Sequence, residues 1–313
     1  MKNRSIAFIF PGQGAQYSGM GRDFYDQYST ARETFQEADD LLGRKLSKII
    51  FEGSETELAE TRNSQLAIYV MSIAIWRVMM ELHPAMLPEA VAGLSLGEYS
   101  ALTCSGKLSF IDGIQLVRHR SQFMNDVCEN TQGTMAVVLG LNAEDVDSLV
   151  REVNMPNDLW AANYNCPGQV VISGTNKGIE AGTNAAKMRG AKRVLPLKVH
   201  GAFHSPLMTP AEKRLEPYIE DVPLQMTSCK LFMNVTGALA ENLLLIRQNL
   251  VAQVSQPVRW EQSVRRMKES GCQSFIEIGC GKSLSGFIRR IDDTLHTVSI
   301  EKVADLHQLE VYT

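Results

Sequence analysis

The sequence predicts an α/β fold, in which strands and helices alternate around a largely parallel sheet. Three short apolar runs end at glycine-rich turns, as buried parallel strands do: Ile6–Phe10, residues 90–92 and Ser274–Ile278. A helical pattern follows two of these turns, from about Glu98 and over Ser283–Ile291. Hydrophobic residues make up 44% of the 313 residues and charged residues 21%, the balance of a globular protein with a substantial core.

The first half of the chain supplies two of the clearest elements. The run Ile6–Phe10 stops at the loop 11–14, Pro-Gly-Gln-Gly, which suits a strand entering a tight turn. It is also too short for the apolar region of a signal peptide. The long apolar stretch 66–82 contains Arg77 and Glu81, so we expect a buried core helix there and no membrane span.

The middle of the chain has a different order of elements. A strand at Thr134–Leu139 is followed by a helix, two strands, a second helix and a last strand. These later elements are expected at 143–153, 159–163, 169–173, 176–188 and 193–199. The order β-α-β-β-α-β is that of a ferredoxin-like unit. We therefore predict a small ferredoxin-like domain at 130–199, inserted into a large α/β domain made of 1–129 and 200–313.

Charge and cysteine usage narrow the class of protein. Lys+Arg 31 against Asp+Glu 35 gives a net charge of −4, which argues against general binding to nucleic acid. Two segments are nevertheless basic, 187–198 and 259–290, and fit either solvated helix faces or a docking surface for an acidic partner. The six cysteines show no C-x-x-C pair and no metal-type spacing with histidine. This pattern favours a reduced, cytoplasmic protein without a metal site.

The strongest local motif is G-x-S-x-G at residues 93–97, between an expected strand and helix. In this nucleophile-elbow pattern a sharp turn exposes the serine hydroxyl, here that of Ser95, and the glycines keep its surroundings clear. The N–H of Leu96 would then lie at a helix N-terminus, where an oxyanion is stabilised. The loop of Gln13 is a candidate for a second donor. The alternative is a small-residue turn that only packs helix on strand.

A serine nucleophile needs a base, and spacing does not choose among histidines that meet the serine only in space. Six are available: His83, His119, His200, His204, His296 and His307. We prefer His204, because residues 201–206 look like a strand end that turns into a helix. For the other five, a structural or surface role is the simpler interpretation.

Taken together, these residues resemble the malonyl-CoA:acyl carrier protein transacylases, the acyltransferases of fatty-acid synthesis. Six segments match the family's motifs in order: 10–16 (FPGQGAQ), 92–102 (AGLSLGEYSAL), 120–124 (RSQFM), 163–174 (NYNCPGQVVISG), 201–208 (GAFHSPLM) and 253–260 (QVSQPVRW). The resemblance implies an α/β-hydrolase-like large domain with a parallel sheet, and it agrees with an inserted ferredoxin-like domain.

The resemblance also implies a role for each matching residue. Ser95 would attack the malonyl thioester and form a malonyl ester, while His204 would take and return the proton. The backbone N–H groups of Gln13 and Leu96 would form the oxyanion hole. Arg120 would bind the free carboxylate of malonyl, which suits the planar fork of arginine better than a lysine ammonium.

Three further positions are implied to serve substrate binding. Gln253 lies where the family has a residue that orients the histidine, through its backbone or its side chain. Asn163 and Asn165 resemble positions that line the approach of the thioester and its pantetheine. The resemblance implies no metal and no cofactor beyond the coenzyme A thioester itself, and an acidic partner, acyl carrier protein. The basic segments 187–198 and 259–290 are then candidates for its docking surface.

The sequence departs from the family's motif at Leu94, where histidine usually precedes the serine. Leucine cannot donate the hydrogen bond of an imidazole, yet nucleophile, base and arginine are all present, so we expect activity to survive. Three alternatives stay open. One is a polyketide-type acyltransferase acting in trans or on methylmalonyl, although Phe203 beside His204 favours malonyl. The others are a serine hydrolase or thioesterase on acyl-CoA, which has no need for Arg120, and a degenerate acyl-binding protein.

Overall fold

The computed structural model describes residues 5–199 and 201–312, and it confirms the α/β class. Its main sheet has six strands in the order β10-β9-β1-β2-β7-β8. They are β1 (Ile6–Phe10), β2 (Ala90–Gly93), β7 (Lys230–Met233), β8 (Ala238–Leu239), β9 (Ser274–Ile278) and β10 (His296–Ile300). All neighbouring pairs are parallel except β7 and β8. The strands predicted at 6–10 and 274–278 have the predicted bounds.

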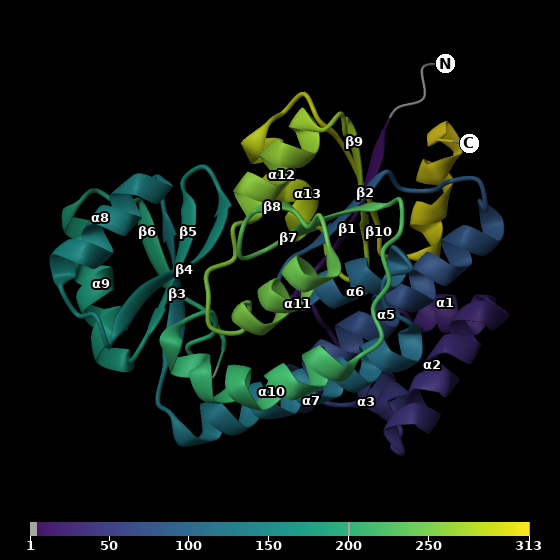
Figure 1. Cartoon of the computed structure of the whole chain (residues 1–313), viewed down its shortest axis with the longest axis horizontal. Coiled ribbons are helices and arrows are strands. Elements are labelled where there is room, and N and C mark those ends of the chain that lie inside the picture. Colours follow the sequence, from purple (N-terminus) through teal and green to yellow (C-terminus); the bar gives the residue numbers. More distant parts are fainter. Residues whose placement is uncertain (1–4, 200, 313) are drawn as a thin grey trace.

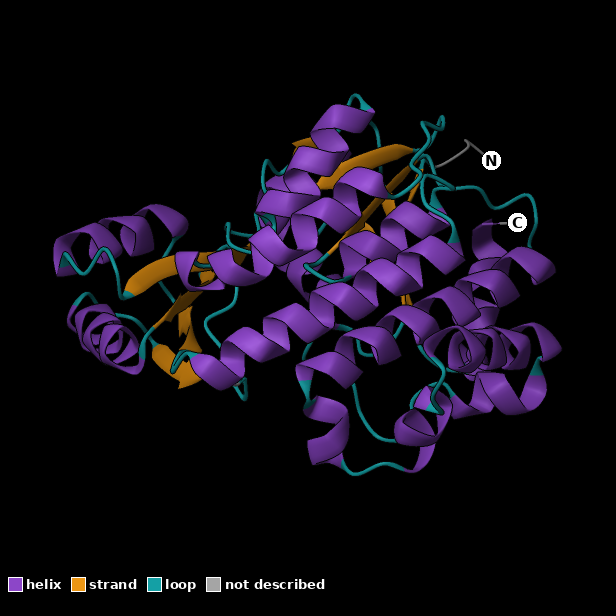
Figure 2. Cartoon of the chain, turned by 60° about the horizontal axis from the view of Figure 1, so that its bottom comes forward, coloured by secondary structure: helices purple, strands orange, loops and turns teal. Residues whose placement is uncertain are grey.

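Both faces of this sheet are covered by helices, which explains why its strands read as unbroken apolar runs. Phe8 and Phe10 of β1 belong to a core that includes α5 (Thr61–Leu82) and α7 (Phe110–Asn130). Alternate residues point the other way, so Ala7 and Ile9 pack with α12 (Trp260–Glu269) and α13 (Ser283–Ile291). Figure 2 shows the strands enclosed by helices.

Helix α5 is the centre of the larger core, as its composition predicts. It is long and apolar enough to cross a membrane, but 72% of its most apolar window is buried inside the protein. The other helices of this part are α1 (Arg22–Gln27), α2 (Ser29–Leu42), α3 (Leu46–Glu52), α4 (Glu55–Ala59), α6 (Gly97–Cys104), α10 (Thr209–Asp221) and α11 (Leu243–Ala252). Two 3₁₀ segments, Pro206–Met208 and Val303–Tyr312, complete it.

A second sheet of four antiparallel strands lies at one end of the molecule, on the left of Figure 1. Its order is β4-β5-β3-β6. The strands are β3 (Thr134–Leu139), β4 (Leu159–Cys166), β5 (Gln169–Gly174) and β6 (Arg193–Pro196). One face packs on α8 (Ala143–Val153) and α9 (Asn176–Met188). Both helices begin at polar caps, since the side chains of Asn142 and Thr175 accept N–H groups of the first turn.

Three local expectations need correction. Strand β6 ends at Pro196 and not at 199, because the chain turns just after it: the N–H of Val199 donates to the carbonyl of Leu197 at 2.9 Å and not to β3. His204 consequently does not follow a strand: residues 201–205 form a turn that leads into the 3₁₀ segment. Strand β4, expected to end at 163, continues to Cys166 through two irregular steps in its pairing with β5.

The two sheets meet through β4. The N–H of Val258, just before α12, donates to the carbonyl of Ala162 at 2.8 Å, and the N–H of Tyr164 donates to the carbonyl of Val258 at 2.9 Å. This contact brings the small sheet close to the carboxyl ends of the main parallel strands, the edge at which α/β proteins bind ligands.

Candidate active site

A cavity of about 290 Å³ lies between the two sheets, at the carboxyl ends of β1 and β2. The loop 11–15 after β1 and Ser95 after β2 line one side. The rest is lined by His204, by residues of α7, β3, β4, β5 and α13, and by Leu197, Val199 and Phe203. Most of the remaining lining is apolar, so a few polar groups converge in a largely apolar pocket, which is the usual form of a small-molecule site.

Ser95 stands on a strained turn between β2 and α6. Its φ is 52°, in the left-handed region that residues other than glycine rarely adopt. The flanking glycines are required by close packing. A Cβ on Gly93 would lie 1.9 Å from the carbonyl carbon of Gly97, and a Cβ on Gly97 would lie 2.1 Å from the carbonyl oxygen of Phe10. The predicted elbow is therefore present in the structure.

Two side chains from distant segments hold the peptide groups of this turn. Asn234, directly after β7, accepts the N–H of Ser95 at 2.6 Å and donates to the carbonyl of Gly93 at 2.7 Å. The Nε2 of Gln253 donates to the carbonyl of Ser95 at 2.9 Å. The backbone polar groups of the turn that presents the nucleophile are thus hydrogen-bonded to side chains of the protein.

His204 is the histidine that reaches Ser95. Its Nε2 lies 2.8 Å from the serine Oγ, and its Nδ1 lies 2.8 Å from the carbonyl oxygen of Gln253. Because a carbonyl only accepts, Nδ1 carries the proton and Nε2 is free to accept from the serine hydroxyl. Burial lowers the pKa of His204 to about 4, and the positive charge of Arg120 is the second cause of this shift. The ring is therefore neutral at neutral pH and ready to act as a base. None of the other histidines in the described part of the chain lines this cavity, and His200 lies outside the described residues.

Arg120 projects from α7 to the other side of the serine. Its Nη2 donates to the Oγ of Ser95 at 3.0 Å and to the Oε1 of Gln253 at 2.9 Å, and its Nη1 donates to the Oε1 of Gln65 at 2.5 Å. The side chain is 1% exposed, and within the described residues it forms no salt bridge and its Nε has no hydrogen-bond partner. A buried guanidinium without a carboxylate partner is suited to receive one from a ligand.

The two predicted oxyanion donors have free amides. Neither the N–H of Gln13 nor that of Leu96 donates to another group of residues 5–199 or 201–312. Their loops also touch, since a Cβ on Gly12 would lie 2.4 Å from the carbonyl oxygen of Leu94. The side chain of Gln13 points to α5, where it bonds Thr61 and Gln65 at 3.2 Å each.

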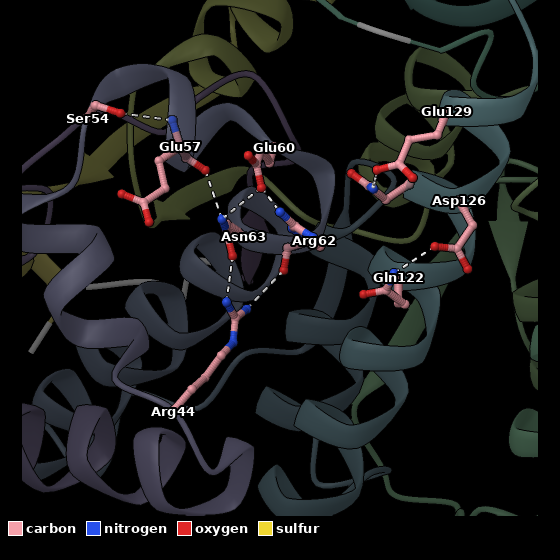
Figure 3. A network of polar contacts seen from close by, with 10 residues as sticks. Arg44, Ser54, Glu57, Glu60, Arg62, Asn63, Gln122, Asp126 and Glu129 are labelled. Atoms are coloured by element: carbon pink, nitrogen blue, oxygen red, sulfur yellow. Dashed lines mark hydrogen bonds and ion pairs between the residues drawn. The ribbon is translucent and has the colours of Figure 1, made fainter.

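A polar network fixes the start of α5, which carries these two partners of Gln13 (Figure 3). Arg44 donates to the Oδ1 of Asn63 at 2.7 Å, while the Nδ2 of Asn63 donates to the carbonyl of Glu57 at 2.9 Å. Arg62 pairs with Glu60 at 2.7 Å. The first turn of α5 is thus held in place without a side-chain cap.

The remaining predicted positions divide into two groups. Asn163 and Asn165 both line the cavity, and the buried Oδ1 of Asn165 has no partner among the described residues. Gln253 is fully buried and adds no surface to the cavity. It instead touches Ser95, His204 and Arg120 from behind, which suits a positioning role better than direct contact with substrate.

Sequence reasoning missed three residues of the site: Gln65, Glu98 and Asn234. Two of them carried a signal. Glu98 is the one acid in a short helix that is buried throughout, and Asn234 is a polar residue directly after a buried strand. Gln65 carried no such signal, because a single amide side chain in an otherwise apolar helix is common in proteins. Among the described residues no group of three His, Cys, Asp or Glu side chains is placed to hold a metal ion.

Comparison with known proteins assigns the family. A sequence profile described as Acyl transferase domain matches residues 7–307. A malonyl CoA-acyl carrier protein transacylase of Bacillus subtilis is 42% identical over 296 residues, which cover 94% of this chain and 93% of the relative. The solved acyl-carrier-protein-S-malonyltransferase of Bartonella henselae superposes with a TM-score of 0.94 at 37% identity, covering 98% of this chain and 99% of that one.

A third neighbour is a malonyl-transacylase solved in complex with its type II PKS acyl-carrier protein. It has a TM-score of 0.93 and 37% identity, over 97% of this chain and 98% of its own. With matches of this extent, the chain belongs to the acyl transferase family and, within it, to the malonyl CoA-acyl carrier protein transacylases.

Proposed function

We propose that this protein transfers malonyl from malonyl-CoA to the phosphopantetheine thiol of acyl carrier protein, through a malonyl ester on Ser95. One observation carries the proposal: the Oγ of Ser95 lies within hydrogen-bond distance of both a neutral imidazole, His204, and an unpaired buried guanidinium, Arg120. The first group makes the serine a nucleophile, and the second selects an acyl group that ends in a carboxylate. We assign this transfer step to fatty-acid synthesis.

In the first half-reaction, Ser95 attacks the thioester carbonyl of malonyl-CoA while His204 takes the hydroxyl proton. The N–H groups of Gln13 and Leu96 stabilise the oxyanion. The C–S bond then breaks, and His204 returns the proton to the departing coenzyme A thiolate. Malonyl is left as an ester on Ser95.

The second half-reaction reverses the roles. His204 takes the proton of the pantetheine thiol, whose sulfur attacks the ester carbonyl, and Ser95 recovers the proton as it leaves. Neither half-reaction changes an oxidation state, so serine, histidine and backbone amides suffice and we propose no metal or cofactor. We further propose a cytoplasmic location, which fits the six free cysteines.

Intact-mass spectrometry after incubation with malonyl-CoA, beside acetyl-CoA, tests the proposal. We expect a malonyl adduct that is absent in Ser95→Ala and disappears when holo carrier protein is added. In Arg120→Lys, which keeps the charge but not the fork, the yield of malonyl adduct should fall by about tenfold or more relative to acetyl. Hydrolysis of malonyl-CoA without an adduct would instead indicate a hydrolase, and an untouched substrate would indicate a binding protein.

For the carrier protein we propose a docking surface at the mouth of the cavity. Phe287 and Ser283 of α13 line the cavity, and Arg289 and Arg290 are exposed on the same helix. Arg290 also donates to the Oε1 of Gln169, another lining residue, at 2.8 Å. Lys192 and Arg193 are exposed at the start of β6. Lys192 lies next to Gly140, and an added Cβ on Gly168 would approach both Gly140 and Arg290.

Several other cations of the two basic segments form ion pairs with acidic residues of the same chain. Arg189 pairs with Glu152, Arg265 with Glu261, and Lys268 with Asp292. The positive charge that has no acidic partner is therefore unevenly distributed over the segments 187–198 and 259–290. The cations beside the cavity are the ones we assign to docking, because an acidic carrier must deliver its pantetheine arm there.

Charge reversal tests the assignment. Lys192→Glu with Arg193→Glu should raise the KM for carrier protein at low ionic strength and leave malonyl loading of Ser95 from malonyl-CoA unchanged. Arg265→Glu, on the ion-paired side of α12, is the matched control and should change neither step. Equal effects of the two reversals, or an effect on loading, would contradict the docking surface.

A further inference from the structure

Glu98 is a second buried ionisable side chain beside the site, and the mechanism above does not use it. It lies in the first turn of α6, is 0% exposed, and takes part in no salt bridge in the described part of the chain. Its Oε1 accepts the backbone N–H of Asn234 and its Oε2 accepts the Nε2 of Gln253, each at 2.6 Å. Both carboxyl oxygens therefore face N–H donors.

The side-chain amide of Gln253 lies between Glu98 and Arg120. Its Nε2 donates to the carboxylate, and its Oε1 accepts from the Nη2 of Arg120 at 2.9 Å. Turning this amide over would set N–H groups against the guanidinium and a carbonyl against the carboxylate. Glu98 and the carbonyl of Ser95, which both accept from Nε2, thus determine which way the amide points, and the amide determines where the guanidinium can lie.

Resting on the proposed function, we propose that Glu98 is a positioning residue: through Gln253 it orients Arg120, and so sets the preference for acyl groups that end in a carboxylate. An acid in direct contact would occupy the arginine fork that the substrate needs. Placed one amide away, Glu98 positions the guanidinium without forming an ion pair with it.

The same carboxylate is tied to the nucleophile. Asn234, whose N–H it accepts, holds the N–H of Ser95, and Gln253 holds the carbonyl of Ser95. Loss of Glu98 can therefore slow loading of any acyl group by loosening the elbow. Only its action through Arg120 changes the preference between malonyl and acetyl, so that ratio is the informative measurement.

Substitution Glu98→Gln is nearly isosteric and replaces one accepting oxygen by an NH₂ group. One of the two donors, the N–H of Asn234 or the Nε2 of Gln253, must then face another donor. We expect the ratio of malonyl to acetyl loading rates, followed by intact mass at pH 9, to fall by about 10- to 100-fold. Glu277→Gln is the matched control: Glu277 is also fully buried and accepts two backbone N–H groups, but none of its hydrogen bonds is to Arg120 or Gln253. The ratio should not change in this control.

The pH dependence of the unmodified enzyme gives a second readout that needs no variant to fold. Burial raises the pKa of Glu98 to about 8, against the opposing effects of Asn234, Gln253 and Arg120. Between pH 6.5 and 9 the neighbouring groups keep their state. Burial raises the pKa of Tyr99 to about 12 and lowers that of His204 to about 4. Burial also lowers the pKa of Arg120, but a guanidinium is not deprotonated in this range. The malonyl:acetyl ratio should therefore rise across this range as Glu98 ionises.

The outcomes separate this inference from the proposed function. A ratio that is unchanged in a folded Glu98→Gln protein, or equal slowing of both acyl groups, overturns the inference alone. If Glu98→Gln does not fold, a ratio in the unmodified enzyme that stays flat from pH 6.5 to 9 overturns it. No malonyl adduct in the unmodified enzyme would overturn the proposed function itself.

Discussion

His204 is oriented by the peptide carbonyl of Gln253, a position that a serine protease fills with a carboxylate. A carbonyl fixes the tautomer as well as a carboxylate does, but it stabilises an imidazolium less. The nearby cation Arg120 acts in the same direction. In the proposed reaction the protonated ring is therefore disfavoured, and the negative charge that would offset it lies on the oxyanion and on the malonyl carboxylate.

Leu94, which precedes the nucleophile where the family usually has histidine, can be tested by substitution. Its side chain lines the cavity and packs with the apolar cluster on the α12 side of the sheet, while the elbow's backbone is held by Asn234 and Gln253. The polar support of the turn thus comes from elsewhere. We expect Leu94→His to change turnover by less than about a hundredfold, or roughly 2.7 kcal/mol of barrier, in a steady-state transfer assay. A larger gain would show that the leucine impairs the enzyme, and Leu94→Met controls for the change of shape.

The strand–elbow–helix unit is the element on which the site depends, and its glycines test this. A Cβ at Gly97 would meet the backbone of Phe10 and Pro11, which cannot move without shifting β1. We expect Gly97→Ala to lower the free energy of unfolding in urea by about 3 kcal/mol or more. Gly286 in α13 has no atom within 4 Å of an added Cβ, so Gly286→Ala should stabilise by up to about 1 kcal/mol. Similar effects of the two substitutions would refute the close packing at the elbow.

Folding of the whole molecule determines how the buried histidine titrates, which predicts a dependence of stability on pH. An unfolded histidine has a pKa of about 6.5, whereas burial lowers the pKa of His204 to about 4. Between these values the unfolded chain binds a proton that the folded chain does not, so His204 lowers the free energy of unfolding as the pH falls.

The measurement is a difference between two proteins, in which other titrating groups cancel. Urea unfolding of the unmodified enzyme and of His204→Asn should be compared at pH 7.5 and pH 4.5. Asparagine suits the test because it tolerates the left-handed backbone at this position, where φ is 56°. The stability difference should shift by about 2 to 3 kcal/mol in favour of the variant at the lower pH. A constant difference would mean that the folded histidine titrates normally.

At the scale of the molecule, the site exists only because the two sheets meet over it. The main sheet brings the loop of Gln13, Ser95 and Asn234 to one edge, since each follows a parallel strand. The small sheet adds Asn163 and Asn165, and closes the cavity from the other side. The groups proposed to act on the acyl group all lie outside the small sheet, which supplies the opposite wall of the cavity.

The sequence by itself determined the fold class, the bounds of the strands Ile6–Phe10 and Ser274–Ile278, and the elbow of Ser95. These follow from local patterns, because periodicity and glycine spacing reflect the backbone of neighbouring residues. The role of Arg120 came from resemblance. Local context favours His204 without that resemblance, but the strand end expected just before it is absent. The end of β6 was placed three residues too far, because the apolar pattern continues to Val199 while the backbone turns after Leu197.

Only the tertiary structure decided which polar groups meet. Ser95 and His204 are 109 residues apart in sequence, and Ser95 and Gln253 are 158 apart. The network of Glu98, Asn234 and Gln253 joins three such segments in the buried interior, where an unpartnered polar group is unfavourable. Burial also determines the pKa values of His204 and Glu98, because desolvation depends on the atoms packed around a group and not on its neighbours in the chain.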